Sequence, residues 1–126
     1  MILEKDGKSK FYFFIMNKTK AQQFKKSCKY IQDLIFQNKK SKGFNISNVP
    51  LEFCLTQGEL AEAFDAWRKN KKDLPEELAD TAIYLFGLAS ILKIDLGNEI
   101  IGKIEKNKKR KYFKNKGVLL KKSANS

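Results

Sequence analysis

The stretch GELAEAFDAWRKNKKDLPEELAD, residues 58–80, decides the fold expected for this chain. It holds two carboxylate pairs of equal spacing, Glu59 with Glu62 and Glu77 with Asp80, separated by a short break. Residues three apart lie on one face of a helix, so each pair places two like charges side by side, at a cost of roughly 0.2–0.5 kcal/mol. If the two helices form an antiparallel hairpin, four carboxylates converge. A divalent cation that prefers oxygen ligands is then the natural counter-charge.

The overall composition limits both the fold and the chemistry. A chain of 126 residues fits one domain, and only 7 Gly and 2 Pro among continuous helical patterns predict an all-α class. Two cysteines, Cys28 and Cys54, fit a reducing compartment, so we expect a cytoplasmic protein. Histidine is absent, which excludes Ser-His and Cys-His catalysis and His-ligated zinc. Any chemistry must therefore use carboxylates, lysines, hydroxyls and metal.

The net charge of +12 is unevenly distributed along the chain. Residues 1–50 carry eleven basic and three acidic groups, and residues 81–126 carry the same numbers. Residues 51–80 instead carry four basic and eight acidic groups. An acidic middle between basic ends suits a metal site that also holds a polyphosphate. The alternative is that most of the lysines form an ordinary solvated surface.

The domain organisation expected from the sequence has three parts. Residues 1–15 are an N-terminal extension, either not native or poorly ordered, with Met16 as the functional start. Residues 16–113 form the helical domain, and residues 114–126 form a basic C-terminal tail. The apolar run Phe11–Met16 is too short for a membrane span or a signal-peptide core, so no membrane association is expected.

Helical spacing of apolar residues predicts four helices. The third becomes apolar on nearly every side after Asp80, and such a helix must be covered all round, so we expect it to form a subunit interface. Thr19, Asp73 and Asp95 are the expected N-caps of the first, third and fourth helices. The expected helices are Thr19–Gln37, Pro50–Asn70, Leu74–Lys93 and Leu96–Tyr112, with a loop over Asn38–Pro50.

The order of several short motifs resembles that of a known family. The motifs are Gly58–Ala63, Glu76–Asp80, Ile94–Leu96 and a Lys103, Asn107, Arg110, Tyr112 ending. The segment Leu55–Tyr112 is similar to the MazG-like all-α nucleoside triphosphate pyrophosphohydrolases, and the resemblance extends over about residues 20–117. In one respect the chain departs from many members, because Leu55 and Thr56 stand where those members carry acids. Glu62 would then have to substitute as a ligand.

The resemblance implies a four-helix, MazG-like bundle completed by oligomerisation, as a dimer or a dimer of dimers. It also implies an enzyme that hydrolyses nucleoside triphosphates to monophosphate and pyrophosphate, in nucleotide pool sanitation, with Mg²⁺ or Mn²⁺ as cofactor. The metal ligands would be Glu59, Glu62, Glu77 and Asp80, of which Glu59 and Glu77 would be catalytic. The substrate-binding residues would be Lys103, Asn107, Arg110, Lys111, Tyr112 and Trp67.

Two other interpretations of the sequence stay open. A basic helical module could bind RNA or DNA through its terminal lysines, but the acidic pairs would repel phosphate unless metal intervened, so nucleic acid is not the expected partner. A catalytically lapsed relative could bind nucleotides without hydrolysing them. Phe44 and Trp67 could stack on a base or pack in the core.

Overall fold

The computed structural model describes residues 2–3, 9–10 and 15–123, and most of them are helical. The helices are α1 (Lys18–Ser41), α2 (Val49–Arg68), α3 (Leu74–Ile91) and α4 (Leu96–Lys108). Two antiparallel hairpins accompany them, β1 (Ile2–Leu3) with β2 (Ser9–Lys10) and β3 (Tyr112–Asn115) with β4 (Val118–Lys121). The expectation of four helices is confirmed. Most of the expected extension 1–15, and residues 124–126 of the expected tail, lie outside the described residues.

The expected limits of the first helix and its loop are wrong. The N-cap of α1 is Asn17 rather than Thr19, because the Asn17 side chain accepts a hydrogen bond from the backbone N–H of Lys20 at 3.0 Å. The helix also continues to Ser41, so the first residues of the expected loop are helical. Lysines in this last turn interact favourably with the negative end of the helix dipole.

The ends of α2 and α3 also differ from expectation, and the same backbone feature explains why both helices stop early. The helix α2 ends at Arg68 rather than Asn70, and α3 ends at Ile91 rather than Lys93. Asn70 and Lys93 have φ angles of 53° and 57°, in the left-handed region where a right-handed helix cannot continue. The start of α2 is displaced by one residue, to Val49, because Asn48 caps it through the N–H of Leu51.

The helix α4 begins as expected and ends early. The Asp95 side chain accepts from the N–H of Asn98 at 3.0 Å, which confirms it as N-cap. Asp73 occupies the N-cap position of α3, but its side chain makes no capping hydrogen bond. The expected end of α4 at Tyr112 is wrong, since the helix stops at Lys108 and Tyr112 begins β3.

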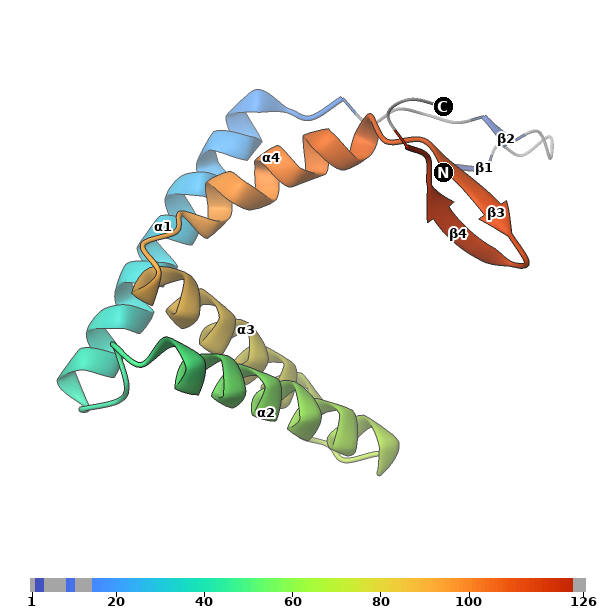
Figure 1. The fold of residues 1–126 in the computed structure, drawn as a ribbon. Helices are drawn as coiled ribbons and strands as arrows, with labels where there is room; N and C mark the ends of the chain where they lie inside the picture. The colour runs from blue at the N-terminus through green and yellow to red at the C-terminus, as the bar shows by residue number, and fades with distance from the viewer. Residues whose placement is uncertain (1, 4–8, 11–14, 124–126) are drawn as a thin grey trace.

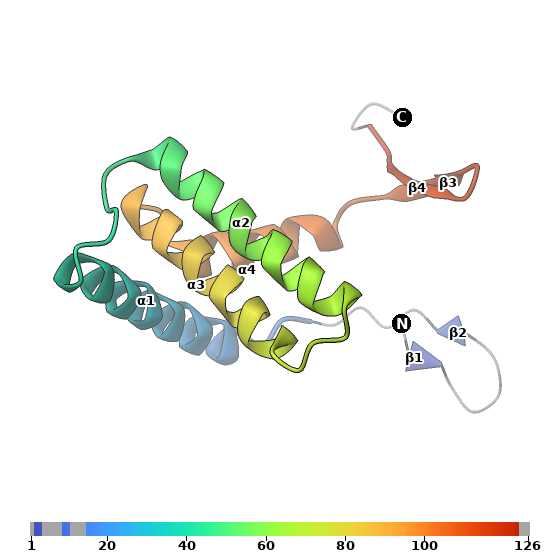
Figure 2. The same cartoon turned by 90° about the horizontal axis from the view of Figure 1, so that it is seen from below.

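The helices form two antiparallel pairs that diverge from a common joint (Figure 1). The helices α2 and α3 make one hairpin, and α4 lies along α1 in the other pair. Packing of α1 on α3 joins the pairs, which Figure 2 shows from below. At the joint, the fully buried Gln32 donates to the carbonyl of Ile94 at 2.9 Å and accepts from the N–H of Leu96 at 3.0 Å. This side chain therefore fixes α1 to the α3–α4 link.

The core of the single chain is small. Its buried apolar residues are Cys28, Ala63, Ala66, Leu88 and Ala89. Large apolar side chains on the α2–α3 hairpin are instead exposed, namely Leu51, Phe53, Leu55, Leu60, Phe64, Trp67, Leu78, Ile83 and Leu85. A soluble monomer seldom leaves so many large apolar groups uncovered on one element pair. Among the described helices, none combines the length and the apolar character needed to cross a membrane.

The β3–β4 hairpin follows α4 directly and projects from the helices (Figures 1 and 2). Its two-residue turn places Lys116 at φ 50° and Gly117 at φ 80°, the backbone of a type I′ turn. The expected boundary between residues 113 and 114 falls inside β3. Residues 112–121 therefore form a regular β-hairpin, which the sequence interpretation did not predict.

Candidate functional site

The antiparallel α2–α3 hairpin brings together carboxylates that are far apart in the sequence. Glu59 extends from α2, and Glu77 and Asp80 extend from the first half of α3. One carboxylate oxygen from each of the three residues can be chosen so that all lie within 4.8 Å of one another. We call these three residues the carboxylate cluster. Three of the four carboxylates that were expected to converge therefore do so, and Glu62 is not among them.

One oxygen of the cluster has no protein partner. Glu77 Oε2 is buried and makes no hydrogen bond to any described residue. A buried polar atom left without a partner costs about 1–3 kcal/mol, and more when the group is charged. Glu59 is likewise partly buried, whereas Asp80 is exposed, so the cluster opens to solvent on the Asp80 side. A cation entering from that side would satisfy the unpartnered oxygen.

The charges of the cluster oppose one another. Burial raises the pKa of Glu59, and the nearby carboxylates of Glu62, Asp80 and Glu77 raise it further. Burial is also the largest cause of the raised pKa of Glu77, followed by repulsion from Glu62, Asp73 and Asp80 and partly opposed by Lys71. Both side chains therefore ionise less readily than a free glutamate, and a nearby positive charge would favour their ionised forms.

The chemistry of the cluster fits Mg²⁺. This ion binds oxygen ligands, uses few protein carboxylates and keeps several waters, so an open site with three acidic side chains suits it. The buried, unpartnered oxygen of Glu77 and the mutual repulsion are both relieved by a divalent cation. Mn²⁺ prefers similar ligands and fits the same residues.

Comparison with family models, with curated proteins and with solved structures gave no match. The resemblance of Leu55–Tyr112 to the MazG-like family thus stays a prediction. The carboxylate cluster itself shows only which residues could hold a metal ion.

Glu62 has a different position from the other predicted ligands. It is exposed and lies outside the group of three close oxygens, yet it is near enough to raise the pKa of Glu59 and Glu77. With Asp65, Lys71 and Glu77 it lines an open pocket of about 390 Å³. Glu62 therefore belongs to the electrostatic surroundings of the cluster.

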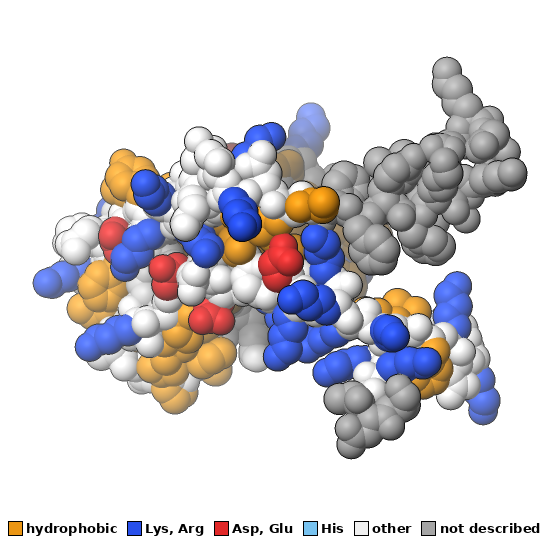
Figure 3. Space-filling view, turned by 90° about the horizontal axis from the view of Figure 1, so that it is seen from above, with side chains coloured by type: hydrophobic (Ala, Val, Ile, Leu, Met, Phe, Trp, Pro, Cys, Tyr) orange, Lys and Arg blue, Asp and Glu red, His pale blue; other side chains and the backbone are white. Residues whose placement is uncertain are grey.

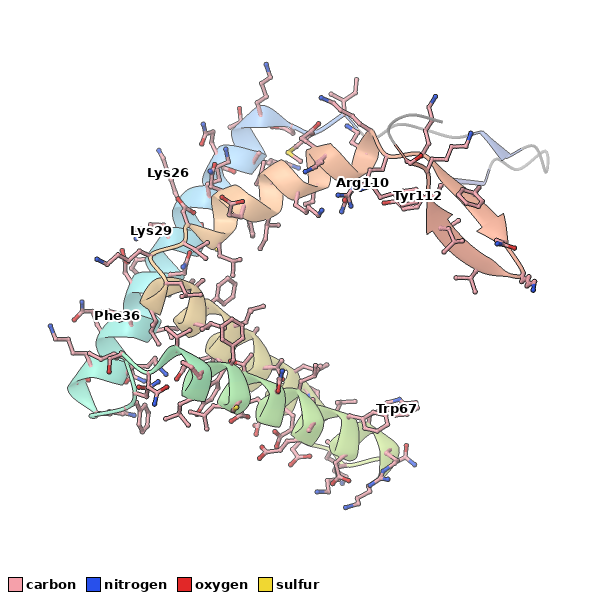
Figure 4. The ribbon with its side chains drawn as sticks, in the orientation of Figure 1. Lys26, Lys29, Phe36, Trp67, Arg110 and Tyr112 are labelled. Carbon is pink, nitrogen blue, oxygen red and sulfur yellow. The ribbon has the colours of Figure 1, made fainter. Side chains whose placement is uncertain are left out.

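The predicted phosphate-binding residues lie elsewhere in the chain. Lys103 and Asn107 are on α4, and Arg110 follows its end, donating from Nη1 to Asn107 Oδ1 at 3.0 Å. This end of α4 lies away from the α2–α3 hairpin (Figure 1). Arg110 and Tyr112 meet at the junction of α4 with β3, where Lys111 joins them in sequence (Figure 4). Within one chain, these residues therefore do not lie beside the carboxylate cluster.

The two aromatic candidates for base stacking have separate surroundings. Trp67 is 62 % exposed at the tip of the α2–α3 hairpin, stacked on Phe64 with ring centroids 5.9 Å apart (Figure 4). Neither it nor the 56 % exposed Phe44 packs in the core of the single chain. Phe44 borders a cavity of about 290 Å³ whose other lining residues are Leu34, Ile35, Asn38, Lys39, Ile83 and Tyr84.

The sequence interpretation missed a polar group between this cavity and the cluster. Lys39 forms a buried ion pair with Glu52, which also accepts from Asn45 Nδ2 at 3.1 Å. The Lys39 ammonium lies 5.2 Å from the centre of the Tyr84 ring. Burial raises the pKa of Tyr84, and the charge of Glu59 raises it further. Helical spacing gave a signal for this group, because Glu52 lies seven residues before Glu59 on the same face.

Thr56 and Leu55 do not contribute to the carboxylate cluster. The Thr56 hydroxyl donates to the carbonyl of Glu52 at 2.8 Å, within its own helix. Leu55 is exposed and offers no ligand atom. The set of close carboxylates is therefore supplied by Glu59, Glu77 and Asp80 alone among the described residues.

Proposed function

We propose that this chain is a Mg²⁺-dependent nucleoside triphosphate pyrophosphohydrolase, which releases a nucleoside monophosphate and pyrophosphate and serves nucleotide pool sanitation. The observation that carries the proposal is the carboxylate cluster, with three oxygens within 4.8 Å and one of its buried oxygens unpartnered. A cluster of this kind, in a chain without histidine, supports hydrolysis that uses a metal and carboxylates. The resemblance of the motifs to the MazG-like family supplies the substrate class.

In this proposal Glu59, Glu77 and Asp80 hold the Mg²⁺. When bound, the ion supplies positive charge to phosphate oxygens and lowers the pKa of a bound water. Glu59 would also accept a proton from the attacking water through a carboxylate oxygen that does not hold the metal, since a carboxylate within hydrogen-bond reach can act as a general base. Glu77 would contribute its buried oxygen, which has no partner among the described residues, to holding the metal. Glu62 adds negative charge beside both residues, which strengthens their need for a cation.

The nucleoside has a suitable place next to the cluster. The cavity of about 290 Å³ lies along α3, one turn beyond Asp80, where Ile83 and Tyr84 line it. Its wall is mostly apolar with a few polar groups, as is typical of pockets for small organic ligands. Phe44 at the rim can stack on a base, and Asn38 offers an amide that can hydrogen-bond to its edge.

The triphosphate requires more cations than Lys71, which lies near Glu77 but is 3.6 Å from Asp65. We propose that a second copy supplies them, with Lys103, Asn107 and Arg110 of the partner chain gripping the phosphates, in a dimer or a dimer of dimers. The uncovered apolar side chains of the α2–α3 hairpin provide the contact surface. Mixing an Asp80→Asn chain with an Arg110→Gln chain tests this arrangement. The mixture should regain activity that neither variant has, and no regain would contradict the shared site.

The activity itself is tested by incubating the protein with a panel of ribo- and deoxynucleoside triphosphates and separating the products by ion exchange. The expected products are the nucleoside monophosphate and pyrophosphate in equal amounts, formed with Mg²⁺ and not with EDTA. Release of orthophosphate and a diphosphate would place the cleavage at the wrong bond. No Mg²⁺-dependent turnover of any triphosphate would overturn the proposal.

A further inference from the structure

The region from the second half of α4 to the end of β4 is strongly basic. Residues 103–122, which we call the basic arm, contain ten Lys or Arg and a single acid, Glu105. The one ion pair that the described residues form within the arm joins Lys108 to Glu105, with a distance of 3.9 Å. Most of this charge is therefore not neutralised by the protein itself. The three residues proposed to grip the triphosphate account for only part of the arm.

The basic arm encloses a cleft suited to phosphate groups. The cleft has a volume of about 450 Å³ and lies between the end of α4 and the hairpin. Six of its lining residues are cations and none is acidic: Lys106, Lys109, Arg110, Lys111, Lys121 and Lys122. Burial lowers the pKa of nearby Lys103, and repulsion from Arg110, Lys106 and Lys121 lowers it further. Such crowding of like charges is relieved when an anion binds.

The register of the hairpin separates its side chains into two different faces. Tyr112 pairs with Lys121 and Lys114 pairs with Leu119, so one face combines an aromatic ring with two cations. The opposite face carries Phe113, Leu120 and Val118 and is apolar apart from Asn115. Every residue of the hairpin is exposed. A ring interleaved with lysines is the pattern of surfaces on which unpaired bases stack.

The position of the arm removes the main objection to a polyanionic partner. From the sequence alone, the acidic pairs were expected to repel a nucleic acid. In the structure, the carboxylates lie on the α2–α3 hairpin and the arm extends from the other helix pair (Figure 1). Figure 3 shows Lys and Arg side chains crowded where the helices meet the β3–β4 hairpin and on the hairpin itself. A nucleic-acid strand can therefore lie on the arm without meeting the acidic cluster.

We propose that the basic arm binds single-stranded nucleic acid, with backbone phosphates in the cleft and a base stacked on Tyr112. The charge of the arm exceeds what one triphosphate needs, and an extended polyanion matches both the cleft and the lysine-bearing hairpin face. This inference does not require the proposed hydrolase activity. The two proposals share Lys103, Asn107 and Arg110, so the variant tested below changes none of these three residues.

Binding of a fluorescein-labelled oligothymidylate of about 20 nucleotides, followed by anisotropy in EDTA, tests the proposal. The variant Lys109→Gln/Lys114→Gln/Lys121→Gln/Lys122→Gln should bind at least tenfold more weakly than wild type. Its slope of log affinity against log salt should be smaller by roughly 3, because each phosphate that a lysine neutralises on a single strand adds about 0.7 to the slope. The matched control replaces four exposed lysines of α1 and its C-cap, in Lys20→Gln/Lys26→Gln/Lys40→Gln/Lys42→Gln.

The control should retain binding within about twofold, since general charge alone contributes only a long-range, salt-screened attraction. No binding by wild type at roughly 50 mM salt, or an equal loss in both variants, would overturn the proposal. Inorganic tripolyphosphate is the competitor that represents the substrate. Complete displacement of the oligonucleotide at an equal concentration of phosphate groups would assign the cleft to the triphosphate and also overturn it. Glu77→Gln should leave oligonucleotide binding unchanged, whatever it does to hydrolysis.

Discussion

Replacing Lys39 with methionine should destabilise the protein more than any surface change. Glu52 is 0 % exposed and Lys39 is 8 % exposed, so the substitution leaves a carboxylate buried without its counter-charge. Removing one partner of a buried pair costs about 3–5 kcal/mol. Asn45 still donates one hydrogen bond to Glu52, but it cannot supply charge. In a domain of this size, the midpoint temperature should fall by roughly 12–20 °C, at about 4 °C per kcal/mol.

Urea unfolding followed by far-UV circular dichroism measures this loss, because most of the described chain is helical. Lys40→Met is the matched control, since Lys40 is the exposed neighbour on the same helix and should change stability by less than about 0.5 kcal/mol. The double variant Lys39→Met/Glu52→Leu should recover most of the loss, because no charge stays buried. A loss for Lys39→Met below about 1 kcal/mol, or no recovery in the double variant, would refute the assignment of a buried ion pair.

Further predictions concern packing and pH. Gly97→Ala should lower the free energy of unfolding by about 1–3 kcal/mol, because a Cβ atom there would lie 2.7 Å from Cys28 Cβ. Gly102→Ala should instead be neutral or stabilising, because no atom lies within 4 Å of a Cβ placed there. If the two substitutions changed the free energy of unfolding in urea equally, the close contact of Gly97 with Cys28 would be contradicted. Folding raises the pKa of Glu59 and Glu77 above the ordinary value of 4.5, so it disfavours their ionised forms. In EDTA, the free energy of unfolding should therefore fall as the pH rises from 4.5 through the raised pKa values. Mg²⁺ should flatten this decline, and an equally steep decline with Mg²⁺ in urea unfolding at several pH values would argue against the metal site.

The sequence predicted the four helices and the convergence of carboxylates because both depend on short-range spacing. Helical periodicity set the helices, and the two acidic pairs, each three residues apart, set the faces of α2 and α3. The helix ends were harder to predict from the sequence. Asn70 and Lys93 stop α2 and α3 by adopting positive φ angles. Asparagine is enriched in this conformation and gave a signal, whereas lysine gives none.

Long-range pairings and the final hairpin could not be predicted in the same way. The ion pair of Lys39 with Glu52 joins two helices whose limits were misplaced, so the residues were not expected to face each other. The β3–β4 hairpin depends on the Lys116–Gly117 turn within a lysine-rich segment, whose composition indicated a solvated tail. The separation of α4 from the carboxylate cluster also depends on how α1 joins the two helix pairs, which no local pattern reports.

The rate of pyrophosphate release during a Mg²⁺ titration shows whether the carboxylate cluster is a catalytic metal site. Three proteins are compared with the triphosphate that wild type hydrolyses fastest: wild type, Glu77→Gln and Asp65→Asn. Asp65 is the matched control, because it is an acid of the same helix hairpin whose partners are Arg68, Lys69 and Lys71 and which lies outside the cluster. We expect saturable activation by Mg²⁺ in wild type and in Asp65→Asn. In Glu77→Gln we expect a loss of at least about 100-fold, because losing even a group that only supports a metal ligand costs about 10–100-fold. Equal Mg²⁺-dependent rates in wild type and Glu77→Gln would contradict this assignment of the cluster.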